Sequence, residues 1–129
     1  AALRFPDRQV FSIVGDGGAL MTGSELATAV AQKAKIRVIV ANNNHYGTIR
    51  YHQEVHFPTR DHYATNLVNP DFAKYGESFG LKCFTIHNTE EILPIIKSAM
   101  EVDGPSLIEF KMSLELNTST TTISQLQTN

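Results

Sequence analysis

The chain has 129 residues, a length that fits one domain and allows roughly two thirds of the unfolded surface to be buried. Eleven Lys and Arg against 13 Asp and Glu give a net charge of −2 without a basic block, which argues against nucleic acid as a partner. The apolar runs are far shorter than the roughly 18 residues that cross a bilayer, and no secretory leader pattern opens the chain. We therefore expect a cytoplasmic protein without a membrane-spanning segment.

Two short apolar runs, residues 10–14 and 36–41, are predicted to be parallel strands covered on both faces, because they are nearly continuous and rich in β-branched residues. Between them, Thr22 with Glu25 three residues later is a capping-box pattern, which predicts a helix that starts at Thr22. A strand, a helix and a second parallel strand form a right-handed unit. Such a unit brings both strand ends to the same edge of the sheet.

The next helix is predicted to have Asn69 as its cap and Pro70 at its first position, and to end at Gly80. Its apolar stripe consists of Phe72, Tyr75 and Phe79. Residues 81–86 follow as a predicted strand.

A further helix is expected after Asn88 or Thr89, either of which could cap it. Pro94 lies inside this pattern, so the helix either begins later than its cap suggests or has a distorted first turn. Its apolar face is expected to consist of Ile92, Ile95, Ile96 and Ala99. Asp103-Gly104-Pro105 ends the helix, and residues 106–111 read as the last strand.

Alternating strands and helices predict an α/β fold, with an open, doubly wound parallel sheet and helices on both faces. We assign this domain to residues 1–112. Residues 113–129 are rich in Ser, Thr, Asn and Gln and are predicted to be a polar tail or extended arm. Ligands of such sheets bind outside the carboxyl ends of the strands, so the turns that follow the strands are the first place to look for a site.

Two polar turns follow the first two predicted strands. Gly15-Asp16-Gly17 closes the first strand, and Asn42-Asn43-Asn44 closes the second. Carboxylate and carboxamide oxygens at one edge are ligands that suit Mg²⁺, and glycines let a phosphate approach the main chain. Each motif alone is also an ordinary turn, because Asp, Asn and Gly are common turn residues. Their joint occurrence favours a site for a divalent cation and a diphosphate.

This pair of motifs resembles the signature of thiamine-diphosphate-dependent enzymes, in which Gly-Asp-Gly is followed by a helix, a strand and then Asn-Asn. The residues around both motifs are similar to those of the acetolactate synthase and 2-oxo-acid decarboxylase branch. The similar segments are residues 15–21, 25–30 and 42–50. One difference is Gly18, where the family often has Ser, which removes a hydroxyl but keeps the backbone donor.

The resemblance implies which residues would bind thiamine diphosphate and Mg²⁺. The metal ligands would be the carboxylate of Asp16, the side-chain oxygen of Asn43 and the main-chain carbonyl of His45. The implied cofactor contacts, which include these three residues, are Asp16, Gly17, Gly18, Ala19, Asn43, His45, Tyr46, Gly47 and Thr48. No catalytic residue is assigned, because the family's activating glutamate lies in a pyrimidine-binding domain of a partner subunit. The residue that bends the cofactor also lies farther upstream than this chain reaches.

Other residues carry weaker signals. His52 and His56 have the helical spacing of a zinc site, but Glu does not follow the first His as metalloproteases require. Together with His62 they form either a packed amphipathic turn or part of a substrate-pocket wall. Cys83 is the only cysteine and lies in an apolar run, so we expect a buried, unreactive thiol.

The resemblance implies a fragment of an acetolactate-synthase-like catalytic subunit that acts on 2-oxo acids, within a homo-oligomer, and that is inactive alone. An alternative within enzymes is a simple 2-oxo-acid decarboxylase. An alternative of another class is a non-catalytic module that binds an anion or a nucleotide, or that mediates assembly.

Overall fold

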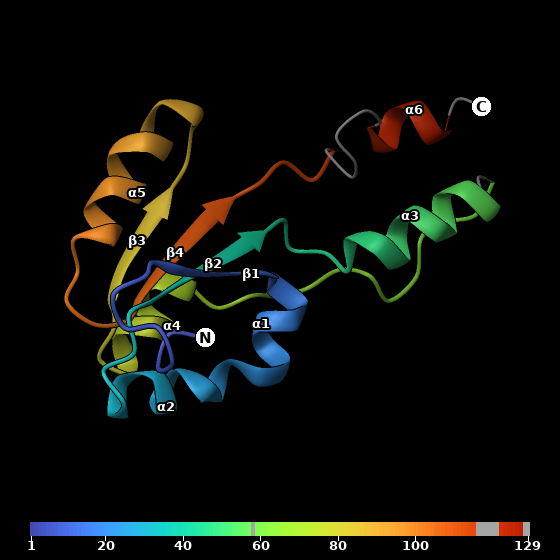
Figure 1. Ribbon diagram of the computed structural model, residues 1–129. Coiled ribbons are helices and arrows are strands. Elements are labelled where there is room, and N and C mark those ends of the chain that lie inside the picture. The colour runs from blue at the N-terminus through green and yellow to red at the C-terminus, as the bar shows by residue number, and fades with distance from the viewer. Residues whose placement is uncertain (58, 116–121, 128–129) are drawn as a thin grey trace.

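The computed structural model describes residues 1–57, 59–115 and 122–127, and it has a four-stranded sheet flanked by helices (Figure 1). The strands are β1 (Val10–Gly15), β2 (Ile36–Asn42), β3 (Lys82–Ile86) and β4 (Ser106–Lys111). They are parallel and lie in the order β1-β2-β4-β3. Since all four run in the same direction, their carboxyl ends share one edge. The predicted α/β fold with an open parallel sheet is confirmed, and the strand predictions are correct to within one residue at each end.

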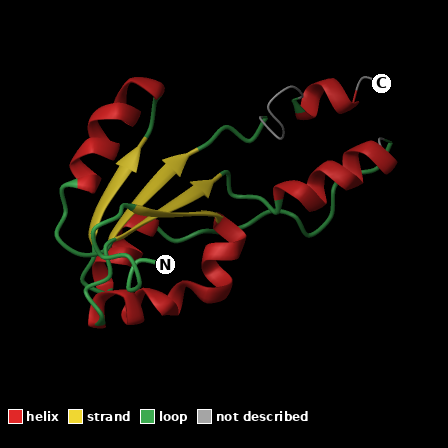
Figure 2. Ribbon diagram, in the orientation of Figure 1, coloured by secondary structure: helices red, strands yellow, loops and turns green. Residues whose placement is uncertain are grey.

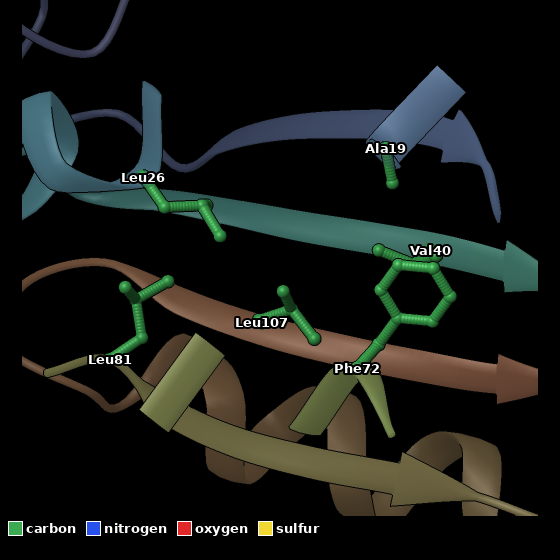
Figure 3. Close-up of a cluster of buried hydrophobic side chains, with 6 residues drawn as sticks. All are labelled: Ala19, Leu26, Val40, Phe72, Leu81 and Leu107. Atoms are coloured by element: carbon green, nitrogen blue, oxygen red, sulfur yellow. The ribbon is translucent and has the colours of Figure 1, made fainter. Parts of the chain in front are cut away.

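One face of the sheet is covered by three helices, α1 (Asp16–Thr22), α2 (Leu26–Ala31) and α4 (Phe72–Ser78). The buried cluster between sheet and helices consists of Ala19, Leu26, Val40, Phe72, Leu81 and Leu107 (Figure 3). Figure 3 shows Phe72 beside Val40 near the strand ends, while Leu26 and Leu81 lie toward the other end of the sheet. The stripe predicted for the Asn69 helix is confirmed, because Phe72, Tyr75 and Phe79 all pack into this cluster.

The opposite face is covered by α5 (Ile92–Met100), as the helix and strand ribbons of Figure 2 show. Ile92, Ile95, Ile96 and Ala99 pack against β3 and β4, as their spacing predicts. Asn88 is the cap, and its side chain accepts from the backbone N–H of Glu91. A 3₁₀ turn (Thr89–Glu91) comes first, so α5 begins two residues before Pro94. The missing donor of Pro94 therefore falls in the first turn, where backbone N–H groups have no intrahelical partner.

Two predicted helix starts are wrong. The first helix begins at Asp16 rather than Thr22, because Gly15 takes the extended conformation of a cap and the chain turns into α1 at once. Thr22 makes no capping hydrogen bond, and Glu25 instead accepts from the hydroxyl of Thr28 at 3.1 Å. The cap of α4 is Asp71, whose carboxylate accepts from the N–H of Lys74 at 3.0 Å, and not Asn69.

Two helices lie apart from the sheet, α3 (Gly47–His56) and α6 (Ile123–Gln127), which pack on each other (Figure 1). Ile123 is buried, and the side chain of Glu115 accepts from the backbone N–H and the hydroxyl of Ser124. Part of the predicted polar arm is thus helical, while residues 116–121 and 128–129 of it lie outside the described residues. None of the helices in the described part of the chain is long and apolar enough to span a membrane.

Candidate functional site

The two polar turns lie beside each other at the carboxyl edge of the sheet. Gly15, the last residue of β1, is in register with Ala41 of β2. Asp16 is therefore the next residue on one strand, and Asn42 ends the other. This placement agrees with the expectation that both motifs meet at one edge, and it follows directly from the parallel pairing.

Asp16 is the first residue of α1, and it is only 3% exposed. Its Oδ1 accepts from the backbone N–H of Gly17 at 2.9 Å, and its Oδ2 accepts from the Nδ2 of Asn69 at 2.7 Å. None of the described Lys, Arg or His side chains lies within 4.0 Å of this carboxylate in an ion pair. A buried carboxylate is thus held by neutral donors alone, which leaves its charge without a compensating cation.

The asparagine turn is fixed by its own side chains. Asn42 is buried, and its Nδ2 donates to Glu109 at 2.6 Å while its Oδ1 accepts from the N–H of Asn44 at 3.1 Å. The Oδ1 of Asn43 accepts from the N–H of His45 at 3.1 Å. Asn44 has a φ of 58°, a left-handed conformation that Asn tolerates better than most residues. Two successive Asx turns therefore set the path of the loop.

A shallow pocket of about 250 Å³ lies between the two loops, lined by residues 15–18 and 45–49. The two walls are in close contact where Tyr46 packs over Gly17, because a Cβ on Gly17 would lie only 2.5 Å from the Tyr46 Cε1 atom. Only glycine fits there without movement of the ring. The predicted contact residues on this pocket are Asp16, Gly17, Gly18, His45, Tyr46, Gly47 and Thr48.

Two predicted contacts lie elsewhere. The side chain of Ala19 packs in the core with Val40 and Phe72, so only its main chain could face a ligand. The side chain of Asn43 is turned toward His45 within its own loop. Their assignment to the cofactor stays a prediction.

The imidazole of His45 is held by the protein. Its Nε2 lies 2.9 Å from an Arg50 guanidinium nitrogen, and its Nδ1 lies 3.2 Å from the carbonyl oxygen of Asn43. Because arginine can only donate, the network assigns the proton to Nδ1 and makes Nε2 the acceptor. Both ring nitrogens of His45 thus have partners within the protein, and its main-chain carbonyl stays the predicted metal ligand.

Of the three histidines with weaker signals, His62 lies beside the site, with its ring centroid 6.0 Å from that of His45, and its part in a substrate-pocket wall stays a prediction. His52 and His56 stack on α3 with their ring centroids 6.0 Å apart, and both are exposed. Across the described parts of the chain, no three His, Cys, Asp or Glu side chains gather as a metal cluster. Cys83 is only partly buried, not buried as expected, but desolvation, with a smaller contribution from Glu77, raises the pKa of its thiol to about 11, which favours an unreactive cysteine.

Two polar residues of the edge were missed in the sequence, the half-buried Asn69 and the buried Glu109. Asn69, expected to cap a helix, instead binds Asp16. Glu109 is 1% exposed, and its Oε1 accepts from Asn42 and from the ammonium group of Lys111, each at 2.6 Å. A glutamate between Ile108 and Phe110 in a buried strand was the available signal, because an acid in such a strand needs a partner.

Comparison with known proteins agrees with this geometry. Residues 1–110 match the family model described as thiamine pyrophosphate enzyme, C-terminal TPP binding domain. The chain belongs to this family. It is therefore the C-terminal thiamine-pyrophosphate-binding domain of such an enzyme, as the two motifs implied.

The relatives include enzymes of several activities. The chain is 37% identical over 118 residues to 3D-(3,5/4)-trihydroxycyclohexane-1,2-dione hydrolase of Bacillus subtilis, with 85% of this chain and 18% of that protein covered. It is 35% identical over 111 residues to the acetolactate synthase large subunit of Corynebacterium glutamicum. This match covers 81% of this chain and 18% of that protein. The chain thus spans about a fifth of the length of these proteins.

A solved structure shares the fold. The thiamine diphosphate-dependent 4-hydroxybenzoylformate decarboxylase of Rhodococcus jostii RHA1 superposes with a TM-score of 0.80 and 30% sequence identity. The match covers 88% of this chain and 21% of that one.

Proposed function

We propose that this domain binds the diphosphate of thiamine diphosphate through Mg²⁺, as part of an acetolactate-synthase-like enzyme that acts on 2-oxo acids. The observation that carries the proposal is the buried carboxylate of Asp16. It faces the asparagine loop at the carboxyl edge of the sheet and has no cationic partner among the described side chains. A hard cation would supply the missing positive charge and would bind the oxygen donors that this edge offers.

The donor set fits Mg²⁺. Each oxygen of Asp16 accepts one hydrogen bond and retains a lone pair, and so does the Oδ1 of Asn43. With the carbonyl of His45 these groups would hold the cation. Phosphate oxygens and water would complete its shell, since Mg²⁺ is usually bound by few protein ligands.

The diphosphate would meet backbone donors from both loops. Because α1 begins at Asp16, the backbone N–H of Gly18 in its first turn has no intrahelical partner, while the N–H of Gly17 already donates to the Asp16 carboxylate. Tyr46, Gly47 and Thr48 would supply the opposite wall of the pocket. Thiamine diphosphate itself supplies the electron sink for reactions of 2-oxo acids. The chain contributes binding and orientation of that group.

A simple 2-oxo-acid decarboxylase remains a second candidate, favoured by the solved decarboxylase of the same fold. Both activities would use this domain in the same way, and the substrate walls would come from the rest of the enzyme. We expect the isolated chain to bind the cofactor weakly and to be inactive. The activating glutamate and half of the enclosure would come from the pyrimidine-binding domain of a partner subunit.

The test is calorimetric titration of the chain with thiamine diphosphate, with and without Mg²⁺. We expect binding that requires the metal and is lost in Asp16→Ala, because the substitution removes the only carboxylate of the ligand set. Asp103→Ala is the matched control, since Asp103 is exposed and forms a surface ion pair with Lys35. Metal-independent binding would indicate an anion or nucleotide module. Absence of binding in the wild-type chain would indicate an assembly module.

A further inference from the structure

Asn69 lies in the segment between α3 and α4 and joins the two loops of the site. Its Nδ2 is 2.7 Å from the Oδ2 of Asp16, 2.9 Å from the Oδ1 of Asn42 and 3.2 Å from the Oδ1 of Asn44. One carboxamide nitrogen thus meets three oxygens from two separate turns. The segment is brought there by backbone pairing, in which Tyr46 donates to Thr65 and Leu67 donates to Asn44.

The orientation of this carboxamide is determined by its surroundings. With nitrogen and oxygen exchanged, the carbonyl oxygen of Asn69 would face the Asp16 carboxylate and two amide oxygens, all of which are acceptors. In the observed orientation, the two N–H bonds of the Asn69 carboxamide are shared among three acceptor oxygens. The Oδ1 of Asn69 is buried and has no hydrogen-bond partner in the described part of the chain. Burial of an unpaired oxygen is unfavourable, so the contacts of the nitrogen must outweigh it.

Asn69 is also the side-chain donor that fixes Asp16. The two carboxylate oxygens have one donor each, the N–H of Gly17 on Oδ1 and Asn69 on Oδ2. The first comes from the neighbouring residue and cannot set the position of the carboxylate relative to the asparagine loop. The hydrogen bond from Asn69 can set this position, because Asn69 binds the asparagine loop at the same time.

We propose that Asn69 is a positioning residue, which holds the Asp16 carboxylate and residues 42–44 in the arrangement that receives the cation. The inference rests on the proposed function. Asn69 does not itself bind the metal or the diphosphate. Its loss would leave Asp16 free to turn away from the asparagine loop and would lower the affinity for the metal–diphosphate pair.

The test compares Asn69→Ala and Asn69→Leu with Asn66→Ala in calorimetric titrations with Mg²⁺ and thiamine diphosphate. Leucine retains the branched shape of the carboxamide without its donor, so agreement between the two Asn69 variants would separate the hydrogen bonds from packing. Asn66 lies in the same segment, but its side chain contacts His62. We expect both Asn69 variants to bind the metal and cofactor at least about tenfold more weakly than the wild type, because each loses a hydrogen-bond donor to a charged group. Asn66→Ala should bind them like the wild type.

A second measurement needs only the wild-type chain. The side-chain N–H₂ signal of Asn69 in ¹H–¹⁵N spectra should be protected from solvent exchange, and it should shift when metal and cofactor are added together. An exposed, unshifted amide, or a folded Asn69 variant with wild-type affinity, would overturn the inference. Titrations of the wild-type chain and of Asp16→Ala test the proposed function separately. If the wild-type chain does not bind the cofactor in a metal-dependent way, the proposed function and the role of Asn69 are both wrong.

Discussion

The contact between Gly17 and Tyr46 shows how strongly one residue constrains the site. Gly17 is in the first turn of α1, and the Tyr46 ring covers it so closely that a Cβ fits only if the ring moves. Gly15, two residues earlier, has open space around its Cα and an extended backbone that any residue can adopt. The two glycines of one motif therefore have different physical reasons to be glycine.

We predict that Gly17→Ala lowers the free energy of unfolding by about 1 to 2 kcal/mol, because overpacking by a methyl group outweighs the gain in helix propensity. Gly15→Ala should change it by less than about 0.5 kcal/mol. Urea denaturation of both variants measures the difference. Equal stability of the two variants would show that Tyr46 moves aside without cost.

At the scale of elements, the start of α4 depends on Asp71. The N–H of Lys74 donates to its carboxylate, and this hydrogen bond, helped by the nearby Lys74 ammonium at 3.3 Å, lowers the pKa of Asp71. A lowered native pKa means that the charged form contributes stability. This contribution is complete above the unfolded pKa of about 3.9 and is lost as the pH falls through the native value.

We predict that Asp71→Ala costs about 1 kcal/mol of unfolding free energy at pH 7, and that the cost decreases as the pH is lowered through the range of Asp titration. Asp71→Asn is the control, because asparagine caps helices without titrating. Urea denaturation between pH 7 and pH 3 tests this. A penalty for Asp71→Ala that is the same at both ends of this range would exclude the charged cap.

At the scale of the whole molecule, the helices cover the sheet unevenly. On the face of the sheet that α5 covers, the helix packs over β3 and β4, while Phe11 and Ile13 of β1 are exposed to solvent. Ile13 is in register with Ile39, which packs under α5, so both lie on this face. Ile13 is 74% exposed. Neighbouring exposed apolar residues on a sheet face indicate a contact surface.

We predict that the isolated chain self-associates through this face and that Ile13→Lys reduces the association without unfolding the domain. Leu93→Lys is the matched control, since Leu93 is 70% exposed but lies at the start of α5. Sedimentation velocity over a range of protein concentrations measures the effect. A monodisperse wild-type monomer would contradict the prediction, and so would equal association of both variants.

The sequence by itself determined the strands, the motifs and the family. The run of residues 106–111 is short, follows Gly104-Pro105 and has Leu107, Ile108 and Phe110 as its apolar residues, so local pattern suffices to predict the β4 strand. The spacing of Gly15-Asp16-Gly17 and Asn42-Asn43 was enough to indicate the thiamine-diphosphate family, to which the chain belongs. Parallel pairing then brings the two motifs together at one edge.

Only the tertiary structure decided the partners of the polar side chains. Asn69 precedes Pro70 and so has the local pattern of a cap, but its strongest contact is with Asp16, 53 residues away. Glu109 likewise finds Asn42 on the neighbouring strand. Such a side chain can form a hydrogen bond either with the nearby backbone or with a distant group. The free energy of the whole fold decides which of these partners it has. Burying the Asp16 carboxylate requires a donor, and the fold supplies it from the segment that happens to pack beside it.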